Sequence, residues 1–287
     1  MDRDPLSAPL KGIGVIIVTH DSEASIDQTL FALRQQTLAP LQVILIDSGS
    51  SDLGYLKHHD REGTLELCFM PNIGFAAANN LGYSSLEESL DYILFLNPDV
   101  ILPKDFLEKA LAWMQTAGRE KVGAITGPLL GWDLEKEVPT GLIDSTGIFE
   151  TGYGRFYDRA QGYQARHNPF QQLERLPAIC GALMFCRKGA LESVKLPHFQ
   201  IFDEDFFCYK EDIDLSYRLR KKGWTLCYVP EFVAYHARGW KTKRSDMERS
   251  VRLMSAKNEL KLHLKGYNPI KIIYSALKYF GVVIFDI

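Results

Sequence analysis

One carboxylate and one imidazole each stand where a buried strand is expected to end, and both suit a metal ion. Asp99 follows Asn97 and Pro98 directly after an apolar run, and His236 closes a later, shorter run. A carboxylate fixed beyond a strand end can hold a divalent cation against a diphosphate, and a nearby imidazole is a sound ligand for Mn²⁺ or Mg²⁺. The alternatives are an ordinary Asn-Pro-Asp turn and a structural histidine.

A second carboxylate, Asp47, ends another apolar run and opens the polar cluster 48–52 (SGSSD). Burying a carboxylate there is costly unless something donates a hydrogen bond to it. The imide N–H of uracil or thymine, or a ribose hydroxyl, would serve as that donor. The alternative is a local turn or a helix cap made by Asp47 itself.

Glu211 and Asp212 are adjacent acids at the start of an expected helix. Neighbouring helical residues point about 100° apart, so we expect only one of them to face a given site. The helix dipole alone favours acids in a first turn. The preceding segment 202–210 (FDEDFFCYK) favours a functional role, because an aromatic wall raises the pKa of a carboxylate and stacks on sugar rings.

Composition and missing motifs exclude several classes of protein. The 287 residues are 46% hydrophobic and 24% charged with a net charge of −3, so the chain is globular and we expect no nucleic-acid partner. Its five cysteines form no CxxC pair, which disfavours a zinc ribbon or disulfide framework and favours a reduced cytoplasm. GxGxxG, GxxxxGK[ST] and GxSxG motifs are absent. The acidic, proline-containing N-terminus does not resemble a signal peptide.

An α/β frame is needed to bring these side chains together. Apolar runs at 13–19, 41–47, 65–70 and 91–96 alternate with helical patterns at 22–36 and 72–81. This order predicts a mainly parallel sheet with helices on both faces, whose ligands bind beyond the carboxyl ends of the strands. The first, second and fourth runs end there in polar clusters.

The second half of the chain has a different pattern. Segment 127–162 is rich in glycine and aromatic residues, which indicates short strands and loops, and further strands are expected at 179–187, 225–229 and 232–236. A helix over 211–222 should end at Gly223. Residues 238–265 include nine basic and only three acidic residues. This basic segment suits either a solvated helix or contact with a diphosphate.

The C-terminal segment Pro269–Ile287 is apolar but interrupted by Lys271, Lys278 and Asp286, so we do not expect it to span a membrane. Lys271, Ser275 and Lys278 recur at helical spacing and form a polar stripe. The pattern predicts an amphipathic helix that either packs on its own domain or lies in a membrane surface.

Taken in order, these segments resemble the family-2 glycosyltransferases of the GT-A fold, particularly their rhamnosyltransferase-like branch. The matching pieces span roughly residues 13–260: VIIVTHDS, LIDSGSSD, NIGFAAANN, LNPDV, CGALMFCRKGAL, FDEDFFCYKEDIDLSYRLRKKGW and YHARGW. The resemblance implies a mainly parallel central sheet flanked by helices, with C-terminal helices. It also implies a catalytic domain at 1–240, with nucleotide-binding and acceptor-binding halves at 13–100 and 101–240, and a helical extension at 241–287.

The resemblance further implies roles for single residues. Asp212 would be the general base with Glu211 beside it, and Asp99 and His236 would bind the metal ion. Nucleotide or donor binding would fall to Thr19, Asp47, Asn72, Asn80, Asn97 and Asp99, and the sugar and acceptor pocket to Gly181, Ala182 and Trp240. Asn97 replaces the first acid of the family's usual DxD motif, which leaves one carboxylate fewer for the cation.

The implied activity is inverting transfer of a sugar, rhamnose among the candidates, from a dTDP- or UDP-activated donor to a glycan or lipid-linked acceptor. A divalent cation, Mn²⁺ or Mg²⁺, would assist. The enzyme would build cell-envelope polysaccharide in the cytoplasm, with peripheral contact to the inner membrane face as an open alternative. Two other functions remain open: a nucleotidyltransferase, which would need a basic glycine-rich loop where segment 20–23 (HDSE) is acidic, and a non-catalytic glycan- or nucleotide-binding relative.

Overall fold

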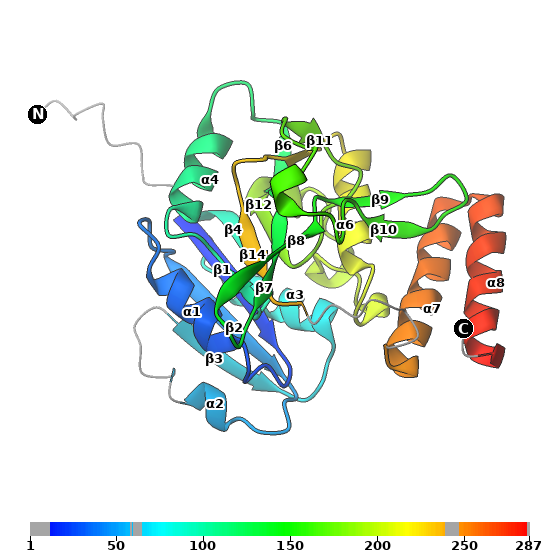
Figure 1. Cartoon of the computed structure of the whole chain (residues 1–287), viewed down its shortest axis with the longest axis horizontal. Coiled ribbons are helices and arrows are strands. Elements are labelled where there is room, and N and C mark those ends of the chain that lie inside the picture. The colour runs from blue at the N-terminus through cyan, green and yellow to red at the C-terminus, as the bar shows by residue number, and fades with distance from the viewer. Residues whose placement is uncertain (1–11, 58, 60–64, 239–246, 286–287) are drawn as a thin grey trace, which may run out of the picture.

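An eight-stranded mixed sheet lies at the centre of the computed structural model, which describes residues 12–57, 59, 65–238 and 247–285 (Figure 1). The strand order is β11-β13-β6-β12-β4-β1-β2-β3. The N-terminal strands β1 to β4 pair in parallel, whereas β12 runs antiparallel to both β4 and β6. The bounds are β1 (Gly12–Thr19), β2 (Gln42–Ser48), β3 (Leu65–Met70), β4 (Leu90–Leu96), β6 (Val122–Thr126), β11 (Glu174–Arg175), β12 (Leu183–Arg187) and β13 (Thr225–Tyr228).

Two smaller sheets and eight α-helices complete the described part of the chain. The first small sheet has the order β5-β14-β7-β8 and the second is the β9–β10 hairpin. Their bounds are β5 (Val100–Ile101), β7 (Leu129–Asp133), β8 (Val138–Ser145), β9 (Ile148–Glu150), β10 (Phe156–Asp158) and β14 (Ala234–His236). The helices are α1 (Ile26–Arg34), α2 (Gly54–Lys57), α3 (Phe75–Ser85), α4 (Phe106–Gln115), α5 (Lys188–Glu192), α6 (Glu211–Lys221), α7 (Arg249–Gly266) and α8 (Pro269–Phe285).

Helices cover both faces of the large sheet, and this explains why its strands are apolar without interruption. All eight residues of β1 are buried. Val15 and Ile17 belong to the core that contains α1 and α4, while Ile16 belongs to the core that contains α3 and α6. Because successive strand residues alternate between faces, a strand buried on both sides needs an apolar residue at every position. The predicted α/β architecture with C-terminal helices is confirmed.

Helix α1 begins four residues later than the sequence pattern suggested. The carbonyl of Ser22 accepts hydrogen bonds from the N–H groups of Ser25 and Ile26, both at 3.1 Å. A turn therefore precedes the helix, with Ser25 at its N-cap position. The predicted apolar face of Ile26, Leu30 and Leu33 is buried, and Gly223 adopts φ +92° just after α6, as expected of a helix terminator.

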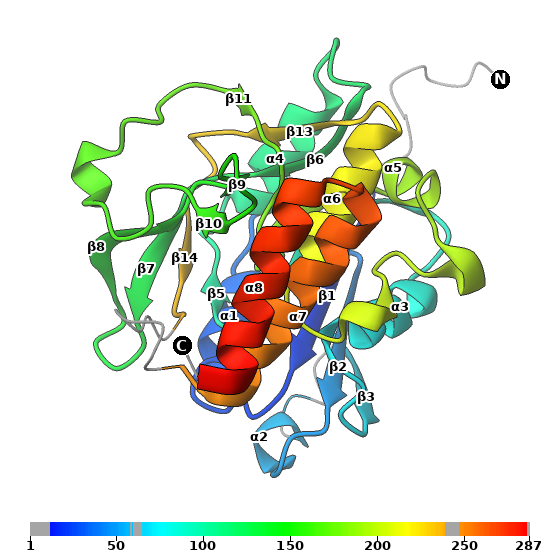
Figure 2. The same cartoon turned by 90° about the vertical axis from the view of Figure 1, so that its right-hand side faces the viewer.

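Helices α7 and α8 form an antiparallel pair on one side of the molecule, away from the large sheet (Figures 1 and 2). The polar stripe of α8 faces inward. The Nζ of Lys271 reaches the Glu150 carboxylate on β9, the Nζ of Lys278 lies 2.7 Å from the Glu259 carboxylate on α7, and Ser275 is fully buried. The helix thus packs on its own chain through its charged side.

The apolar side of α8 consequently faces outward. Six large side chains, which we call the outer face of α8, are 56–69% exposed: Ile270, Ile273, Leu277, Phe280, Ile284 and Phe285. This is the reverse of the usual arrangement, in which a terminal helix buries its apolar stripe. None of the helices in the described ranges combines the length and the hydropathy that crossing a bilayer requires.

A close backbone approach at Gly127 sets the position of β14. A Cβ atom at Gly127 would lie 1.9 Å from the carbonyl oxygen of Phe232. We expect Gly127→Ala to destabilise the protein by about 1–3 kcal/mol through overpacking, measured by urea unfolding. Gly189→Ala is the control, because nothing lies within 4 Å of the added methyl group. Equal stability of the two variants would contradict the close approach.

Candidate active site

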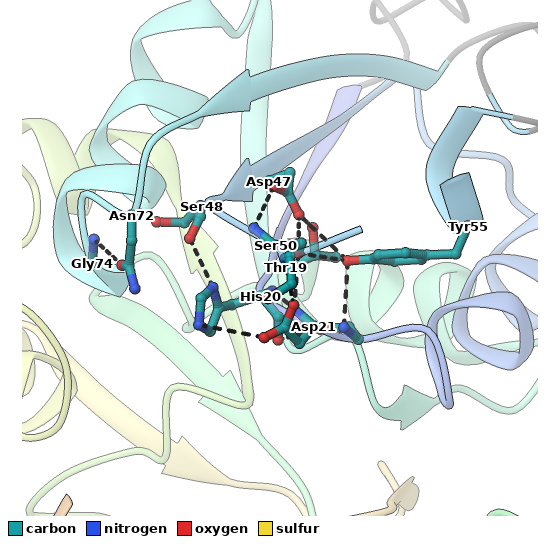
Figure 3. Close-up of polar contacts among 11 residues, drawn as sticks. Thr19, His20, Asp21, Asp47, Ser48, Ser50, Tyr55, Asn72 and Gly74 are labelled. Atoms are coloured by element: carbon teal, nitrogen blue, oxygen red, sulfur yellow. Dashed lines mark hydrogen bonds and ion pairs between the residues drawn. The ribbon is translucent and has the colours of Figure 1, made fainter. Parts of the chain in front are cut away.

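The carboxyl ends of β1 and β2 carry a polar network around Asp47 (Figure 3). Asp47 is 1% exposed. Its Oδ2 accepts hydrogen bonds from the hydroxyls of Thr19 at 3.0 Å and Ser50 at 2.5 Å, and its Oδ1 accepts the N–H of Ser50 at 3.0 Å. The Tyr55 hydroxyl on α2 lies 3.3 Å from Oδ2. The protein itself therefore satisfies much of this carboxylate, and Oδ1 retains acceptor capacity.

His20 and Asp21, which follow β1, form an exposed surface beside this network. The Nδ1 of His20 lies 2.9 Å from the carbonyl oxygen of Ser48, and Asp21 accepts the N–H of Ser51 at 2.7 Å. Both side chains are about half exposed, at 50% and 45%. The ends of β1 and β2 are thus bound to each other through side chains. Sequence reasoning gave Ser50 no role, although it lies in the polar cluster 48–52, and it missed Tyr55, which lies outside every motif.

The two predicted asparagines differ in how their amides are used. The Oδ1 of Asn72 accepts the N–H of Gly74 at 3.2 Å, in the turn before α3 (Figure 3). The Nδ2 of Asn80 donates to the carbonyl of Phe202 at 2.8 Å, and its Oδ1 accepts the N–H groups of Ile201 and Phe202, both at 2.9 Å. Asn80 therefore connects α3 to the segment before the acids. Its contact with nucleotide or sugar stays a prediction.

A cavity of about 290 Å³ brings together most of the other predicted residues. It lies where β4 and β12 of the large sheet meet the start of α6 and the end of β14. The predicted residues that line it are Asn97, Asp99, Gly181, Ala182, Glu211, Asp212 and His236. The lining also includes Asp158 and Cys180, to which the sequence analysis gave no role, and Tyr209 and Lys210 from the segment 202–210. Trp240 lies outside the described residues.

His236 is buried between two carboxylates. Its Nε2 lies 3.2 Å from Oδ1 of Asp99, and its Nδ1 lies 2.8 Å from Oδ2 of Asp144 on β8. Burial alone would lower the pKa of His236, but the two carboxylates outweigh it and raise the pKa to about 9. Asp144, 92 residues away in sequence, fixes the ring orientation, which is the usual arrangement around a metal-binding histidine.

The donor atoms around Asp99 fit a divalent cation. Asn97 Oδ1 is buried and has no hydrogen-bond partner among the described residues, while Asp99 Oδ1 is buried beside the imidazole of His236. Carboxylate, amide oxygen and imidazole are ligands that Mn²⁺ and Mg²⁺ accept. In the described ranges no cluster of three or more His, Cys, Asp or Glu side chains is placed to hold a metal ion. The described residues thus offer suitable donor atoms without a full set of protein ligands.

Both adjacent acids line the same cavity, so the expectation that only one would face it is wrong. Lys210, just before them, is in the left-handed region at φ +77°, and Glu211 and Asp212 occupy the first turn of α6. Helical side chains lean toward the N-terminus of their helix, so two successive first-turn residues both reach the space in front of it. The 100° rule applies to the flank of a helix rather than to its end.

The two acids have different hydrogen-bond environments. Oδ2 of Asp212 accepts the N–H of Gly181 at 2.9 Å, and Oδ1 accepts the N–H of Ile213 at 2.8 Å. Glu211 is 5% exposed, and its Oε2 has no partner within the described chain. Asp212 is therefore the better stabilised anion of the two.

Burial raises the pKa of both acids. For Glu211, burial and then the charge of Asp212 raise the pKa to about 8. For Asp212, burial raises the pKa while the N–H of Gly181 opposes the shift. The two N–H groups that contact Asp212 favour its charged form, whereas Glu211 Oε2 has no such donor within the described chain. Two carboxyl groups with different environments in a single cavity suit proton transfer.

Arg238 brings positive charge to this acidic cavity. Its NH1 lies 3.2 Å from Oδ2 of Asp158 and 3.8 Å from Oδ1 of Asp144, and the guanidinium side chain is 41% exposed. Arg238 and Lys210 are the arginine and the lysine among the residues that line the cavity. The sequence indicated Arg238 only as the start of a basic stretch.

The fold and the site together define a sugar transferase of the GT-A fold. Residues 14–195 match glycosyl transferase family 2, and the chain belongs to this family. The glycosyltransferase class expected from the sequence is confirmed, which sets aside the nucleotidyltransferase and the non-catalytic alternatives.

The curated relatives include rhamnosyltransferases. N-acetylglucosaminyl-diphospho-decaprenol L-rhamnosyltransferase of Mycobacterium tuberculosis (strain H37Rv) is 27% identical over 248 residues, covering 80% of this chain and 77% of that protein. Rhamnosyltransferase WbbL of Escherichia coli (strain K12) is 28% identical over 171 residues, covering 57% of this chain and 60% of that protein. The chain is thus similar to the branch that its motifs predicted.

Solved structures with low sequence identity share the fold. GalNAc-T7, whose crystal structure contains UDP, GalNAc and Mn²⁺, aligns with a TM-score of 0.62 at 15% identity over 94% of this chain, and the chain spans 54% of its length. Mannosyltransferase PcManGT from Pyrobaculum calidifontis, in complex with GDP-Man and Mn²⁺, aligns with a TM-score of 0.57 at 16% identity, over 96% of this chain and 74% of that one. Both alignments support the GT-A fold.

The raised pKa of Glu211 makes stability depend on pH. The folded pKa of about 8 exceeds the ordinary value of 4.5, so the folded state holds the proton more tightly, and stability present below pH 4.5 is lost as pH rises toward 8. We expect Glu211→Gln to melt at a higher temperature than the wild type at pH 8.5 and to lose this advantage at pH 5. Thermal denaturation across this range measures the effect.

The exposed residue Glu88 supplies the matched control for this pH series. Glu88→Gln should follow the wild-type melting temperature at every pH, because a solvated carboxylate has the same environment in the folded and unfolded states. A Glu211→Gln difference that does not change with pH would contradict the assignment.

Proposed function

We propose that this protein is an inverting glycosyltransferase that moves a sugar, rhamnose in the first instance, from a dTDP- or UDP-activated donor to a hydroxyl of a glycan or lipid-linked acceptor. The observation that carries the proposal is the position of Asp212, whose carboxylate is oriented by two N–H groups in the same cavity as Asp99 and His236. The proposed base and the proposed diphosphate site would thus share one cavity.

The named relative supports both the sugar and the acceptor. The Mycobacterium protein is an L-rhamnosyltransferase whose acceptor is N-acetylglucosaminyl-diphospho-decaprenol, and its similarity covers 80% of this chain. By this likeness we propose a polyprenyl-diphosphate-linked sugar as acceptor and polysaccharide assembly as the process. The proposed division of the chain is a catalytic part at 1–240 and a helical extension at 241–287.

Asp212 is proposed to act as the general base. Its carboxylate accepts the proton of the acceptor hydroxyl while the oxygen attacks C1 of the sugar from the face opposite the departing diphosphate, which inverts the anomeric configuration. Glu211, protonated beside it, lowers the negative charge near the attacking oxygen. Gly181 orients Asp212 and, with Ala182 and Trp240, is proposed to line the sugar and acceptor pocket.

Asp99 and His236, with the amide oxygen of Asn97, would hold Mn²⁺ or Mg²⁺. When bound, a divalent cation neutralises negative charge on the diphosphate leaving group. Arg238 is 41% exposed beside them, and we propose that its guanidinium also binds a phosphate oxygen, as arginine does in bidentate geometry. Thr19, Asp47, Asn72 and Asn80 are the proposed nucleotide- or donor-binding residues of the N-terminal half.

The outer face of α8 supports peripheral binding at the cytoplasmic side of a membrane. A lipid-linked acceptor is confined to a bilayer, and an amphipathic helix that presents its apolar side to the outside can lie in the lipid interface. The lysines of α8 do not weaken this face, since Lys271 and Lys278 point inward to Glu150 and Glu259.

We expect Asp212→Asn to lower sugar transfer by about 10²–10⁴-fold because the proton acceptor is lost. Nucleotide binding should be unchanged, since Asp47 and Thr19 lie at the other end of the site. Transfer is measured with dTDP-rhamnose and a short-chain N-acetylglucosaminyl-diphospho-polyprenol. Binding is measured by calorimetric titration with UDP and dTDP, each with and without Mn²⁺. Full turnover by Asp212→Asn would overturn the base assignment.

We expect the wild type to float with vesicles containing anionic phosphatidylglycerol and the double variant Ile273→Ser plus Leu277→Ser to stay unbound. Each large apolar side chain contributes about 1.5–3 kcal/mol on burial, so losing two weakens binding by roughly 100-fold or more. Phe199→Ser is the control, because Phe199 is 82% exposed but lies outside α8. Unaltered flotation of the double variant would exclude this face as the lipid contact.

A further inference from the structure

The segment just before the catalytic acids has an unusual backbone. Phe207, Tyr209 and Lys210 have φ values of +60°, +70° and +77°. Side chains other than glycine rarely adopt this left-handed region, and such residues persist only where their surroundings hold them. Because Lys210 directly precedes Glu211, the path of this segment sets where α6 begins and where its first two side chains point.

A single asparagine on α7 holds this segment. Asn258 is 2% exposed. Its Nδ2 lies within hydrogen-bond distance of three backbone carbonyls, those of Phe206 at 2.6 Å, Cys208 at 2.8 Å and Tyr209 at 2.9 Å. The three acceptors converge on one amide group because the left-handed residues turn the chain around it.

Two lysines extend the contact along the same side of α7. Lys261 donates to the carbonyl of Asp205, and Lys265 pairs with the carboxylates of Asp203 and Asp214. Positions 258, 261 and 265 are spaced so that they share one face of a helix. Helix α7 therefore contacts the segment 203–209 from one end to the other and also the second turn of α6.

We propose that Asn258 is a positioning residue for the reaction: it holds the left-handed segment so that Glu211 and Asp212 enter the cavity in productive geometry. The proposal rests on the proposed function, in which Asp212 is the base. It gives the pair of helices α7 and α8, which we call the C-terminal hairpin, a second role. Helix α8 carries the outer face, and α7 positions the segment that leads into the acids.

The chemistry at this position requires a donor. Carbonyl oxygens only accept hydrogen bonds, and the carbonyls of Cys208 and Tyr209 would lose the Asn258 donor if residue 258 could not donate, while that of Phe206 would keep only the N–H of Cys208. Asn258→Asp keeps the shape of the side chain but sets a carboxylate against three carbonyls, so the segment should move away. Glu259→Gln is the matched control, since Glu259 is also buried on α7 but pairs with Lys278 of α8.

The test compares kcat, the KM for dTDP-rhamnose and the calorimetric Kd for UDP and dTDP in these variants. We expect Asn258→Asp to lower kcat by about 10–100-fold, because a small displacement of a catalytic group has an effect of this size. The Kd values should stay within about twofold. Glu259→Gln should keep its kcat even where its melting temperature falls by the same amount. Hydrogen exchange of amides 206–212 should accelerate in Asn258→Asp alone.

If Asn258→Asp does not fold, Lys265→Met replaces it as the test variant, since Lys265 is 39% exposed and contacts the same segment. A lower kcat with unchanged Kd values for UDP and dTDP in Lys265→Met would also support the proposal. If Asn258→Asp keeps the wild-type kcat and amide exchange while Asp212→Asn is inactive, the positioning role is overturned and the proposed function stands. An equal loss of kcat in Glu259→Gln would also overturn it. Full activity of Asp212→Asn would instead overturn the proposed function on which it rests.

Discussion

A carboxylate removed from water has to be met by donors or by a cation, and this chain buries several of them between segments that are distant in sequence. Asp47 is met by hydroxyls at the ends of β1 and β2, Asp144 by His236, and Glu150 by Lys271 of the last helix. Each pair joins two elements. The edge of the sheet where the site lies is therefore held together by polar contacts as well as by apolar packing.

The same constraint distinguishes the adjacent acids Glu211 and Asp212. Asp212 has an N–H group on each of its oxygens, whereas Glu211 is buried with one oxygen unpartnered among the described residues. A buried carboxyl without donors keeps its proton, and its neighbour with donors gives the proton up. The first turn of α6 thus places two carboxyl groups with different hydrogen-bond environments side by side.

The C-terminal hairpin joins the site to the surface. Polar side chains on its inner side contact the rest of the chain: Asn258 and Lys265 of α7 contact the segment before the acids, and Lys271 and Lys278 of α8 pair with Glu150 and Glu259. The outer face of α8 points away from the protein. The same pair of helices therefore carries both this face and the contacts to the segment 203–209.

The sequence by itself determined the frame: continuous apolar runs predicted the doubly covered strands, and the ordered motifs predicted the family and brought Asp99, Asp212 and His236 forward as candidates. Tertiary structure decided the rest. Asp144 and Asn258 carry no motif, and their partners lie 92 and 49–52 residues away. Periodicity found the two sides of α8 but not which side faces the protein. A local pattern records what a residue can do, whereas its partner depends on which distant segment the fold brings within hydrogen-bond distance.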